Sequence, residues 1–138
     1  NPIPEPQTET STRHEVVFGG GMMGPSATGK MDWTVNGVAA SGHNLDPVLT
    51  LPRGESVILT LRNETAWWHP IHLHGHSFRV LSRNGKPTRY REWQDTVLMA
   101  PRERVEIAFV ADNLGDWMFH CHILEHQAAG MMGVIRVA

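Results

Sequence analysis

Residues 120–126 read HCHILEH, and they overlap a short apolar stretch, Trp117 to Cys121, that we expect to form a β-strand. Side chains of consecutive residues in a strand point to opposite faces of the sheet. Cys121 should therefore face one way, while His120 and His122 face the other. A strand with this pattern can serve two metal sites, one on each face. It indicates a β-sheet protein whose chemistry lies at this strand.

The face that carries the thiol has three candidate partners for Cys121. His126 lies five residues further along the chain, Met131 lies five beyond that, and His69 comes from another predicted strand. Two imidazoles, one thiolate and one thioether form the ligand set of a blue-copper electron-transfer site. Zinc would more often take several cysteines or a carboxylate. This set therefore predicts copper.

A second histidine-rich stretch, residues 69–76, reads HPIHLHGH. His72 and His74 are two residues apart on one predicted strand, which separates them by about 6.6 Å and suits two adjacent ions better than one. Together with His120 and His122 they offer four imidazoles and no carboxylate, which favours copper over magnesium, calcium or manganese. A zinc hydrolase would instead need an aspartate at the end of this stretch.

The rest of the chain reads as short extended segments separated by turn signals. Asn36-Gly37 and Asn84-Gly85 are typical hairpin-turn dipeptides. Roughly eight or nine strands at regular spacing predict an all-β sandwich or barrel. One helical turn is expected, from Ile123 to Ala128. The predicted strands are Glu15 to Phe18, Asp32 to Val35, Val48 to Leu51, Ser56 to Leu61, Ile71 to Ser82, Thr96 to Met99, Val105 to Val110, Trp117 to Cys121 and Gly133 to Val137.

The length and composition are those of one domain. The chain has 138 residues and a formal net charge of -2, so nothing indicates binding to nucleic acid or to an acidic membrane. No stretch is long and apolar enough to span a bilayer, and the single cysteine excludes an internal disulfide. Residues 1–13 lack the apolar core of a secretory signal. Their prolines and polar side chains predict a linker or flexible N-terminal segment, which leaves residues 14–138 as the domain.

The segments HPIHLHGH and HCHILEH, with the methionine that follows, resemble the two copper signatures of the last domain of multicopper oxidases, the family of laccases and bacterial copper oxidases. The resemblance covers residues 69–131 and implies a Greek-key β-sandwich of the cupredoxin type. It implies these type 1 copper ligands: His69, Cys121, His126 and Met131. It implies His72 as a type 2 ligand and, as type 3 ligands, His74, His120 and His122.

The resemblance also implies an activity for the intact protein. In that family the type 1 copper takes electrons from a small reducing substrate, which for this chain could be a phenol, an aromatic amine or cuprous ion. The electrons pass through the cysteine, here Cys121, to its flanking histidines and the trinuclear cluster, which reduces dioxygen to water. Substrate is expected to approach near His126 or His69. Such enzymes are usually exported, so we expect a periplasmic or secreted protein.

The chain departs from the family pattern in one respect. The family's cluster uses eight histidines, four of them from another cupredoxin domain, whereas His14 and His43 are isolated here. We therefore expect a partner domain to supply the other half, and the isolated domain to be inactive. A free-standing blue-copper electron carrier and a subunit of an oligomeric small laccase remain open. A copper nitrite reductase would lack the second flanking histidine, here His122.

Two further polar residues lie close to these motifs. We expect His76 to support the ligands through hydrogen bonds rather than to bind metal itself. Asp95 is expected either to fix the tautomer of a metal-bound imidazole or to be an ordinary residue at a strand edge.

Overall fold

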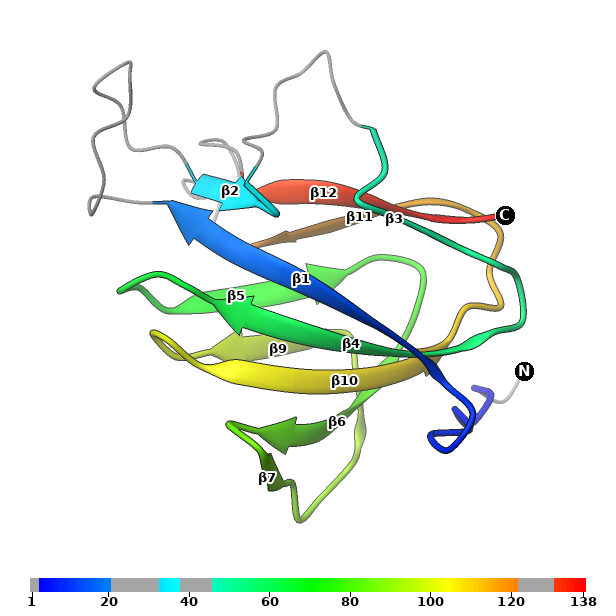
Figure 1. The fold of residues 1–138 in the computed structure, drawn as a ribbon. Helices are drawn as coiled ribbons and strands as arrows, with labels where there is room; N and C mark the ends of the chain where they lie inside the picture. Colours follow the sequence, from blue (N-terminus) through cyan, green and yellow to red (C-terminus); the bar gives the residue numbers. More distant parts are fainter. Residues whose placement is uncertain (1–2, 21–32, 38–45, 122–130) are drawn as a thin grey trace.

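The structure, a computed structural model, describes residues 3–20, 33–37, 46–121 and 131–138. Within them the secondary structure consists of strands arranged in two sheets (Figure 1). A seven-stranded sheet has the order β2-β1-β4-β10-β6-β7, with β8 also paired to β6, and a five-stranded sheet has the order β3-β12-β11-β5-β9. The strands are β1 (Thr12–Gly20), β2 (Trp33–Val35), β3 (Leu49–Leu51), β4 (Ser56–Asn63), β5 (His69–Leu73), β6 (Phe78–Arg83), β7 (Lys86–Pro87), β8 (Trp93–Gln94), β9 (Thr96–Met99), β10 (Arg104–Val110), β11 (Gly115–Cys121) and β12 (Met132–Val137).

The two sheets enclose one apolar core, because alternate side chains of each strand turn inward. Strand β5 alternates between buried and half-buried residues along its whole length, and so does β6. Phe18 of β1 and Phe119 of β11 meet across the core with their ring centroids 5.6 Å apart. Fully burying a phenylalanine side chain contributes about 1.5–3 kcal/mol, so this contact is a substantial link between the sheets.

The chain crosses repeatedly between the two sheets, as a Greek-key sandwich requires. Strand β4 lies in the seven-stranded sheet, β5 in the five-stranded sheet and β6 in the first again; β9, β10 and β11 alternate in the same way. The β1–β4 and β3–β12 pairs are parallel, while the pairs around β5 and β11 are antiparallel. The all-β sandwich predicted from the sequence is confirmed. The helical turn predicted from Ile123 to Ala128 lies outside the described residues.

The prediction of a single extended segment from Ile71 to Ser82 was wrong. The chain leaves β5 at Leu73, turns at His74 and Gly75, and enters the opposite sheet as β6. Gly75 has a φ of 78°, a conformation that favours glycine, and a Cβ there would lie 2.4 Å from Cδ2 of the Trp117 indole. The turn therefore depends on a residue without a side chain.

The N-terminal residues contact the sandwich before the first strand begins. The backbone N–H of Gln7 donates to Ser56 Oγ over 2.9 Å, and Glu5 pairs with Arg79 on β6. Strand β1 begins at Thr12, and the boundary predicted between residues 13 and 14 stays a prediction. In the part of the chain that the structure describes, no helix has the length and apolar character needed to cross a membrane.

Candidate metal centre

Strands β5 and β11 are antiparallel neighbours, and their pairing aligns the two histidine-rich stretches. His120 lies opposite His72, and Cys121 lies opposite Ile71. Because side chains alternate along each strand, His120 and His72 share one face of the sheet and Cys121 lies on the other. The face that carries Cys121 is the one that packs into the core.

On the core face, the thiol of Cys121 meets the imidazole of His69. Both side chains are fully buried, and Sγ lies 3.5 Å from Nδ1. Metal–nitrogen and metal–sulfur bonds of about 2.0 and 2.3 Å, the values for zinc, would place two such ligand atoms about 3.5–3.7 Å apart on one ion at bond angles of about 110–120°. The observed separation is close to that spacing, so this pair of donors fits a shared metal.

Met131 belongs to the same buried region. Met131 is fully buried, and its backbone carbonyl accepts a hydrogen bond of 3.2 Å from the backbone N–H of Cys121. A thiolate, an imidazole and a thioether sulfur are soft or intermediate donors that suit copper. The structure thus brings three of the four predicted type 1 residues into one apolar environment, and the fourth, His126, lies outside the described residues.

On the opposite face, three imidazoles form a compact group. The ring centroids of His72 and His74 are 4.5 Å apart, those of His74 and His120 are 5.0 Å apart, and those of His72 and His120 are 5.6 Å apart. Nε2 of His74 lies 2.9 Å from Nε2 of His120. His74 occupies the turn after β5 rather than the strand that was predicted. The rings are therefore closer together than strand spacing alone would make them. His122 lies outside the described residues.

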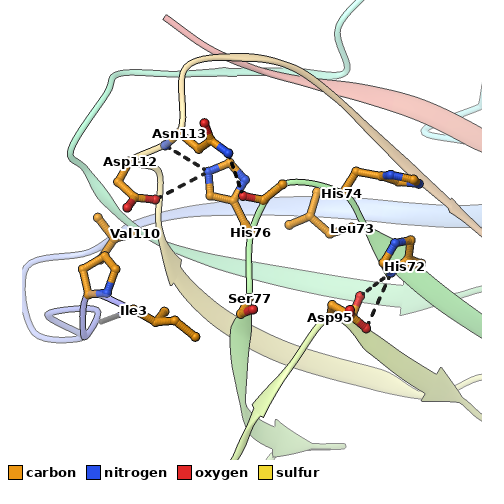
Figure 2. Close-up of a pocket in the computed structure, with 12 residues that line it drawn as sticks. Ile3, His72, Leu73, His74, His76, Ser77, Asp95, Val110, Asp112 and Asn113 are labelled. Carbon is orange, nitrogen blue, oxygen red and sulfur yellow. Dashed lines mark hydrogen bonds and ion pairs between the residues drawn. The ribbon is translucent and has the colours of Figure 1, made fainter. Parts of the chain in front are cut away.

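Backbone carbonyls set the protonation pattern of two of these rings. Nδ1 of His72 lies 2.9 Å from the carbonyl oxygen of Asp95, and Nδ1 of His120 lies 2.8 Å from that of Cys121. A carbonyl oxygen only accepts hydrogen bonds, so in both neutral rings Nδ1 carries the hydrogen and Nε2 keeps its lone pair. In both rings Nε2 is therefore the nitrogen left as an acceptor, and that of His120 faces Nε2 of His74 (Figure 2 shows His72 beside Asp95).

Asp95 holds His72 mainly through its backbone. Its carboxylate oxygen Oδ1 lies 3.7 Å from Nδ1 of His72, beyond hydrogen-bond distance, and accepts a hydrogen bond of 3.0 Å from the Thr96 hydroxyl. The Thr96 oxygen in turn lies 3.1 Å from Nδ1 of His72. No sequence pattern singled out Thr96, because a threonine on a strand is ordinary.

An open cavity of about 590 Å³ lies beside His72 and His74 (Figure 2). His76 borders it as a largely buried ring, packed between Phe109 and Trp117. Burial lowers the pKa of His76, although the charge of Asp112 and the backbone of His74 act in the opposite direction. Nε2 of His76 accepts a weak hydrogen bond of 3.4 Å from the backbone N–H of Asn113. His76 therefore forms part of the cavity wall as a packed ring.

The structure corrects the expectation that substrate could approach the type 1 site at His69. The metal-ligand roles of the histidines, Cys121 and Met131 stay predictions. His69 is fully buried, so its ring edge is not a point where substrate can approach. Within the part of the chain that the structure describes, no three His, Cys, Asp or Glu side chains converge closely enough to hold one ion by themselves. The sequence analysis also missed Thr65, whose hydroxyl lies 2.8 Å from Nε2 of His69.

Comparisons with known proteins agree on one family. The family model described as multicopper oxidase matches residues 16–138. The chain is 41% identical to the multicopper oxidase MmcO of Mycobacterium tuberculosis over 102 residues, which cover 74% of this chain and 19% of that protein. It is 37% identical over 108 residues to copper resistance protein A of Escherichia coli, covering 78% of this chain and 17% of that protein.

Solved structures show the same likeness in three dimensions. The crystal structure of a multicopper oxidase from Pseudomonas thermotolerans superposes with a TM-score of 0.85 at 33% identity, covering all of this chain and 32% of that one. McoA from Aquifex aeolicus gives a TM-score of 0.80 at 30% identity, covering 99% of this chain and 31% of the other. The chain thus spans less than a third of each of these proteins.

Proposed function

The chain belongs to the multicopper oxidase family and has its cupredoxin fold, and from this membership we propose that it is the domain that holds the type 1 copper and half of the trinuclear cluster. The observation that carries the proposal is the separation of two donor groups by one sheet. Cys121 and His69 meet in the core, while His72, His74 and His120 gather on the other face.

The proposed type 1 site consists of His69, Cys121, His126 and Met131. The 3.5 Å approach of Sγ to Nδ1 and the complete burial of the described members support it. His126 is included because of its place in the HCHILEH motif. When bound there, copper would supply one-electron redox chemistry, and a thioether beside one thiolate and two imidazoles is the donor set typical of electron-transfer copper sites.

The proposed half-cluster consists of His72 as the type 2 ligand and His74, His120 and His122 as type 3 ligands. The Nδ1–H groups of His72 and His120 are held by backbone carbonyls, so their Nε2 lone pairs are already oriented. Another cupredoxin domain would supply the remaining histidines. The cavity beside His72 and His74 gives that domain a surface to approach.

Strand β11 provides the route for electrons between the two sites. Cys121 is joined to His120 by one peptide bond, and the Cys121 carbonyl also accepts the hydrogen bond from Nδ1 of His120. The peptide bond and this hydrogen bond are thus two separate connections between the thiol side of the sheet and the imidazole side. A through-bond path of this length needs no mobile carrier.

For the intact protein we propose the one-electron oxidation of a small reductant, coupled to the reduction of dioxygen to water. A phenol, an aromatic amine and cuprous ion are the candidate substrates, and the copper-resistance name of one relative favours a role in copper handling. We also propose a periplasmic or secreted location, because enzymes of the family that the motifs resemble are usually exported. Substrate would approach near His126, since His69 is buried.

The free-standing electron carrier is the less favoured alternative. Such a carrier needs only the core-face site and has no use for three adjacent imidazoles on the opposite face. A subunit of an oligomeric small laccase would use both faces, as the proposed domain does. Size-exclusion chromatography with copper present, followed by an oxidase assay, distinguishes the carrier from the small-laccase subunit. The carrier is expected to stay monomeric and to lack oxidase activity.

Visible absorption and EPR spectra of the copper-loaded protein test the proposal. An intense thiolate band near 600 nm, roughly the usual position for a blue-copper site, is expected with a type 1 EPR signal. The Cys121→Ser variant is the control and should lose both. A copper-loaded protein with no thiolate band would contradict the assignment.

A further inference from the structure

We propose that Thr65 is a positioning residue for His69, and that Asn63 holds the Thr65 hydroxyl in the orientation this requires. Thr65 lies between β4 and β5, four residues before His69. The inference rests on the proposed type 1 site. It concerns how the chain orients one donor before any metal is bound.

The contacts form a short chain of buried polar groups. Oγ1 of Thr65 lies 2.8 Å from Nε2 of His69 and 2.6 Å from Oδ1 of Asn63. His69 is fully buried, and Thr65 and Asn63 are each 1% exposed. Water cannot readily replace a lost partner at this depth, so each hydrogen bond determines the arrangement of its neighbours.

The orientation of the Asn63 amide follows from its other contacts. Its Nδ2 donates to the carbonyl of Trp67 over 2.7 Å and to the carbonyl of Ala100 over 2.9 Å. Both donors of the side chain are therefore used, and Oδ1 is left as the acceptor. Oδ1 also accepts the backbone N–H of Thr65 over 3.1 Å. The amide has no freedom to turn over without losing these bonds.

The position of the hydroxyl hydrogen on Thr65 can then be deduced. Two oxygens at 2.6 Å repel unless a hydrogen lies between them, and Oδ1 of Asn63 carries none. The Trp67 carbonyl is a second acceptor within reach, at 3.2 Å, but the much shorter contact directs the Thr65 hydrogen to Asn63, and the lone pairs of Oγ1 remain to accept hydrogen bonds. One accepts the backbone N–H of Trp67 over 3.2 Å, and the other faces Nε2 of His69.

This arrangement fixes the tautomer of His69. Because the Thr65 oxygen can only accept at that position, Nε2 of His69 must carry the hydrogen and Nδ1 must carry the lone pair. Nδ1 is the atom that lies 3.5 Å from Sγ of Cys121. The hydroxyl thus directs the metal-binding lone pair of His69 toward the thiol.

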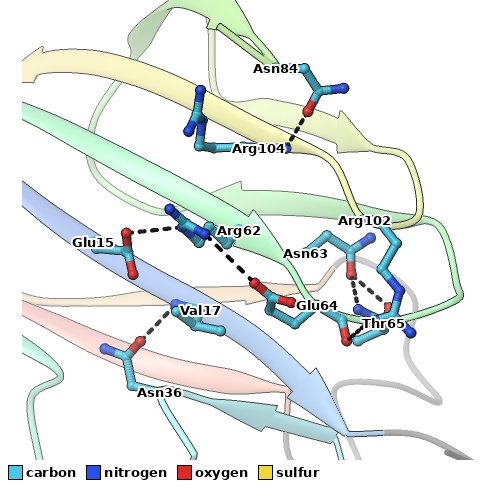
Figure 3. Close-up of polar contacts among 10 residues, drawn as sticks. All are labelled: Glu15, Val17, Asn36, Arg62, Asn63, Glu64, Thr65, Asn84, Arg102 and Arg104. Atoms are coloured by element: carbon cyan, nitrogen blue, oxygen red, sulfur yellow. Dashed lines mark hydrogen bonds and ion pairs between the residues drawn. The ribbon is translucent and has the colours of Figure 1, made fainter.

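The surrounding backbone keeps the network in place, and Figure 3 shows Asn63, Thr65 and Arg102 in this part of it. The backbone N–H of Asn63 donates to the carbonyl of Glu103 over 2.9 Å, and the backbone N–H of Arg102 donates to the carbonyl of Thr65 over 3.2 Å. These bonds attach the segment before β5 to the turn between β9 and β10. Hydrogen-bond partners of this kind make a ligating histidine more basic and fix its ring, and their loss weakens metal binding.

The test compares Thr65→Val, which keeps the shape of the side chain and removes the hydroxyl, with Thr65→Ser, which keeps the hydroxyl. In the intact copper-loaded protein, Thr65→Val should lower the affinity for type 1 copper by about 10–100-fold against a competing chelator. It should also raise the reduction potential, because a less basic imidazole stabilises the oxidised ion less. The type 1 EPR signal should broaden, and Thr65→Ser should stay close to the parent protein in all three measurements.

Thr12→Val is a matched control for the loss of a threonine hydroxyl. Oγ1 of Thr12 is buried and has no hydrogen-bond partner among the described residues, so its removal should leave the copper site unchanged. A parent protein without a thiolate band would refute the proposed function itself. A parent with that band, combined with a folded Thr65→Val whose affinity, potential and EPR signal are unaltered, would refute only the role of Thr65. If Thr65→Val and Thr65→Ala both fail to fold while Thr65→Ser folds, the hydroxyl serves the fold, and the positioning role is again refuted.

Discussion

His120 and Cys121 are consecutive residues of β11, yet their side chains lie on opposite faces of the five-stranded sheet. Nε2 of His120 is 2.9 Å from Nε2 of His74, and Sγ of Cys121 is 3.5 Å from Nδ1 of His69. The five-stranded sheet therefore separates two chemically different groups of donors, one on each of its faces. Substitutions on the two faces should consequently have separable effects.

Replacing the thiol should abolish electron entry while leaving the histidine face intact. The Cys121→Ser variant is expected to lose the thiolate absorption band. Its rate of substrate oxidation should fall by more than about 10–100-fold, the loss that follows when only a supporting hydrogen bond is removed. Steady-state oxidation assays and absorption spectra of the copper-loaded protein measure both. Retention of substantial turnover by a folded Cys121→Ser protein would contradict the proposed route.

Replacing a histidine on the other face should have the converse result. The His72→Ala variant is expected to keep the thiolate band, since His72 does not lie on the core face. Oxygen consumption by the intact protein should be lost, and stoichiometric reduction of the type 1 copper by substrate should remain. Oxygen uptake and anaerobic reduction, measured on one sample, distinguish these outcomes. Loss of the thiolate band in His72→Ala would show that the two faces are not independent.

The turn at Gly75 should tolerate no side chain. Gly75→Ala combines a positive φ with a Cβ placed 2.4 Å from the Trp117 indole. Backbone strain of about 1–2 kcal/mol and overpacking of about 1–3 kcal/mol together predict a loss of about 2–5 kcal/mol in the free energy of unfolding. Gly54→Ala is the matched control, because Gly54 has a φ of 87° and no described atom within 4 Å of its Cβ position. Chemical denaturation should show a clearly larger loss for Gly75→Ala, and equal losses would exclude the clash as the cause.

The Glu5–Arg79 pair should attach the N-terminal residues in a pH-dependent way. The hydrogen bond from Arg79 holds the pKa of the Glu5 carboxyl below its usual value of 4.5. A carboxyl with a lowered pKa stabilises the folded arrangement above its usual pKa, and this contribution is lost as the pH falls through the lowered value. Hydrogen exchange of residues 3–11 should therefore be unchanged between pH 7 and 5 after correction for intrinsic rates, and faster once the pH falls through the lowered pKa of Glu5. Glu5→Gln should show the faster exchange already at pH 7, and an identical profile for this variant would contradict the prediction.

The sequence allowed the sandwich and the alternation in β11 to be predicted. These features follow from a local rule, the two-residue period of a strand, which needs no knowledge of the tertiary contacts. The turn at Gly75 was missed, and its need for glycine depends partly on the indole of Trp117, a residue distant in sequence. His74 was consequently assigned to a strand, so the grouping of His72, His74 and His120 was predicted, but not how close the rings of His72 and His74 are.

The supporting residues of the candidate site were also missed, for a related reason. Thr65 and Asn63 have ordinary side chains in an ordinary loop, and their importance comes from contacts with His69, Trp67 and Ala100. Hydrogen-bond networks of this kind leave no periodic pattern in a sequence. They become visible only once donors and acceptors can be counted in three dimensions.

Strand β1 lies between β2 and β4, with residues 12–18 paired in parallel to residues 57–63. A truncated version of this domain that began after β1 would expose the long edge of β4, and bare strand edges of this kind promote aggregation. Dissection of the protein for expression should therefore keep the chain from before Thr12 onward. A shortened fragment that precipitates would say nothing about whether its copper ligands are correctly assigned.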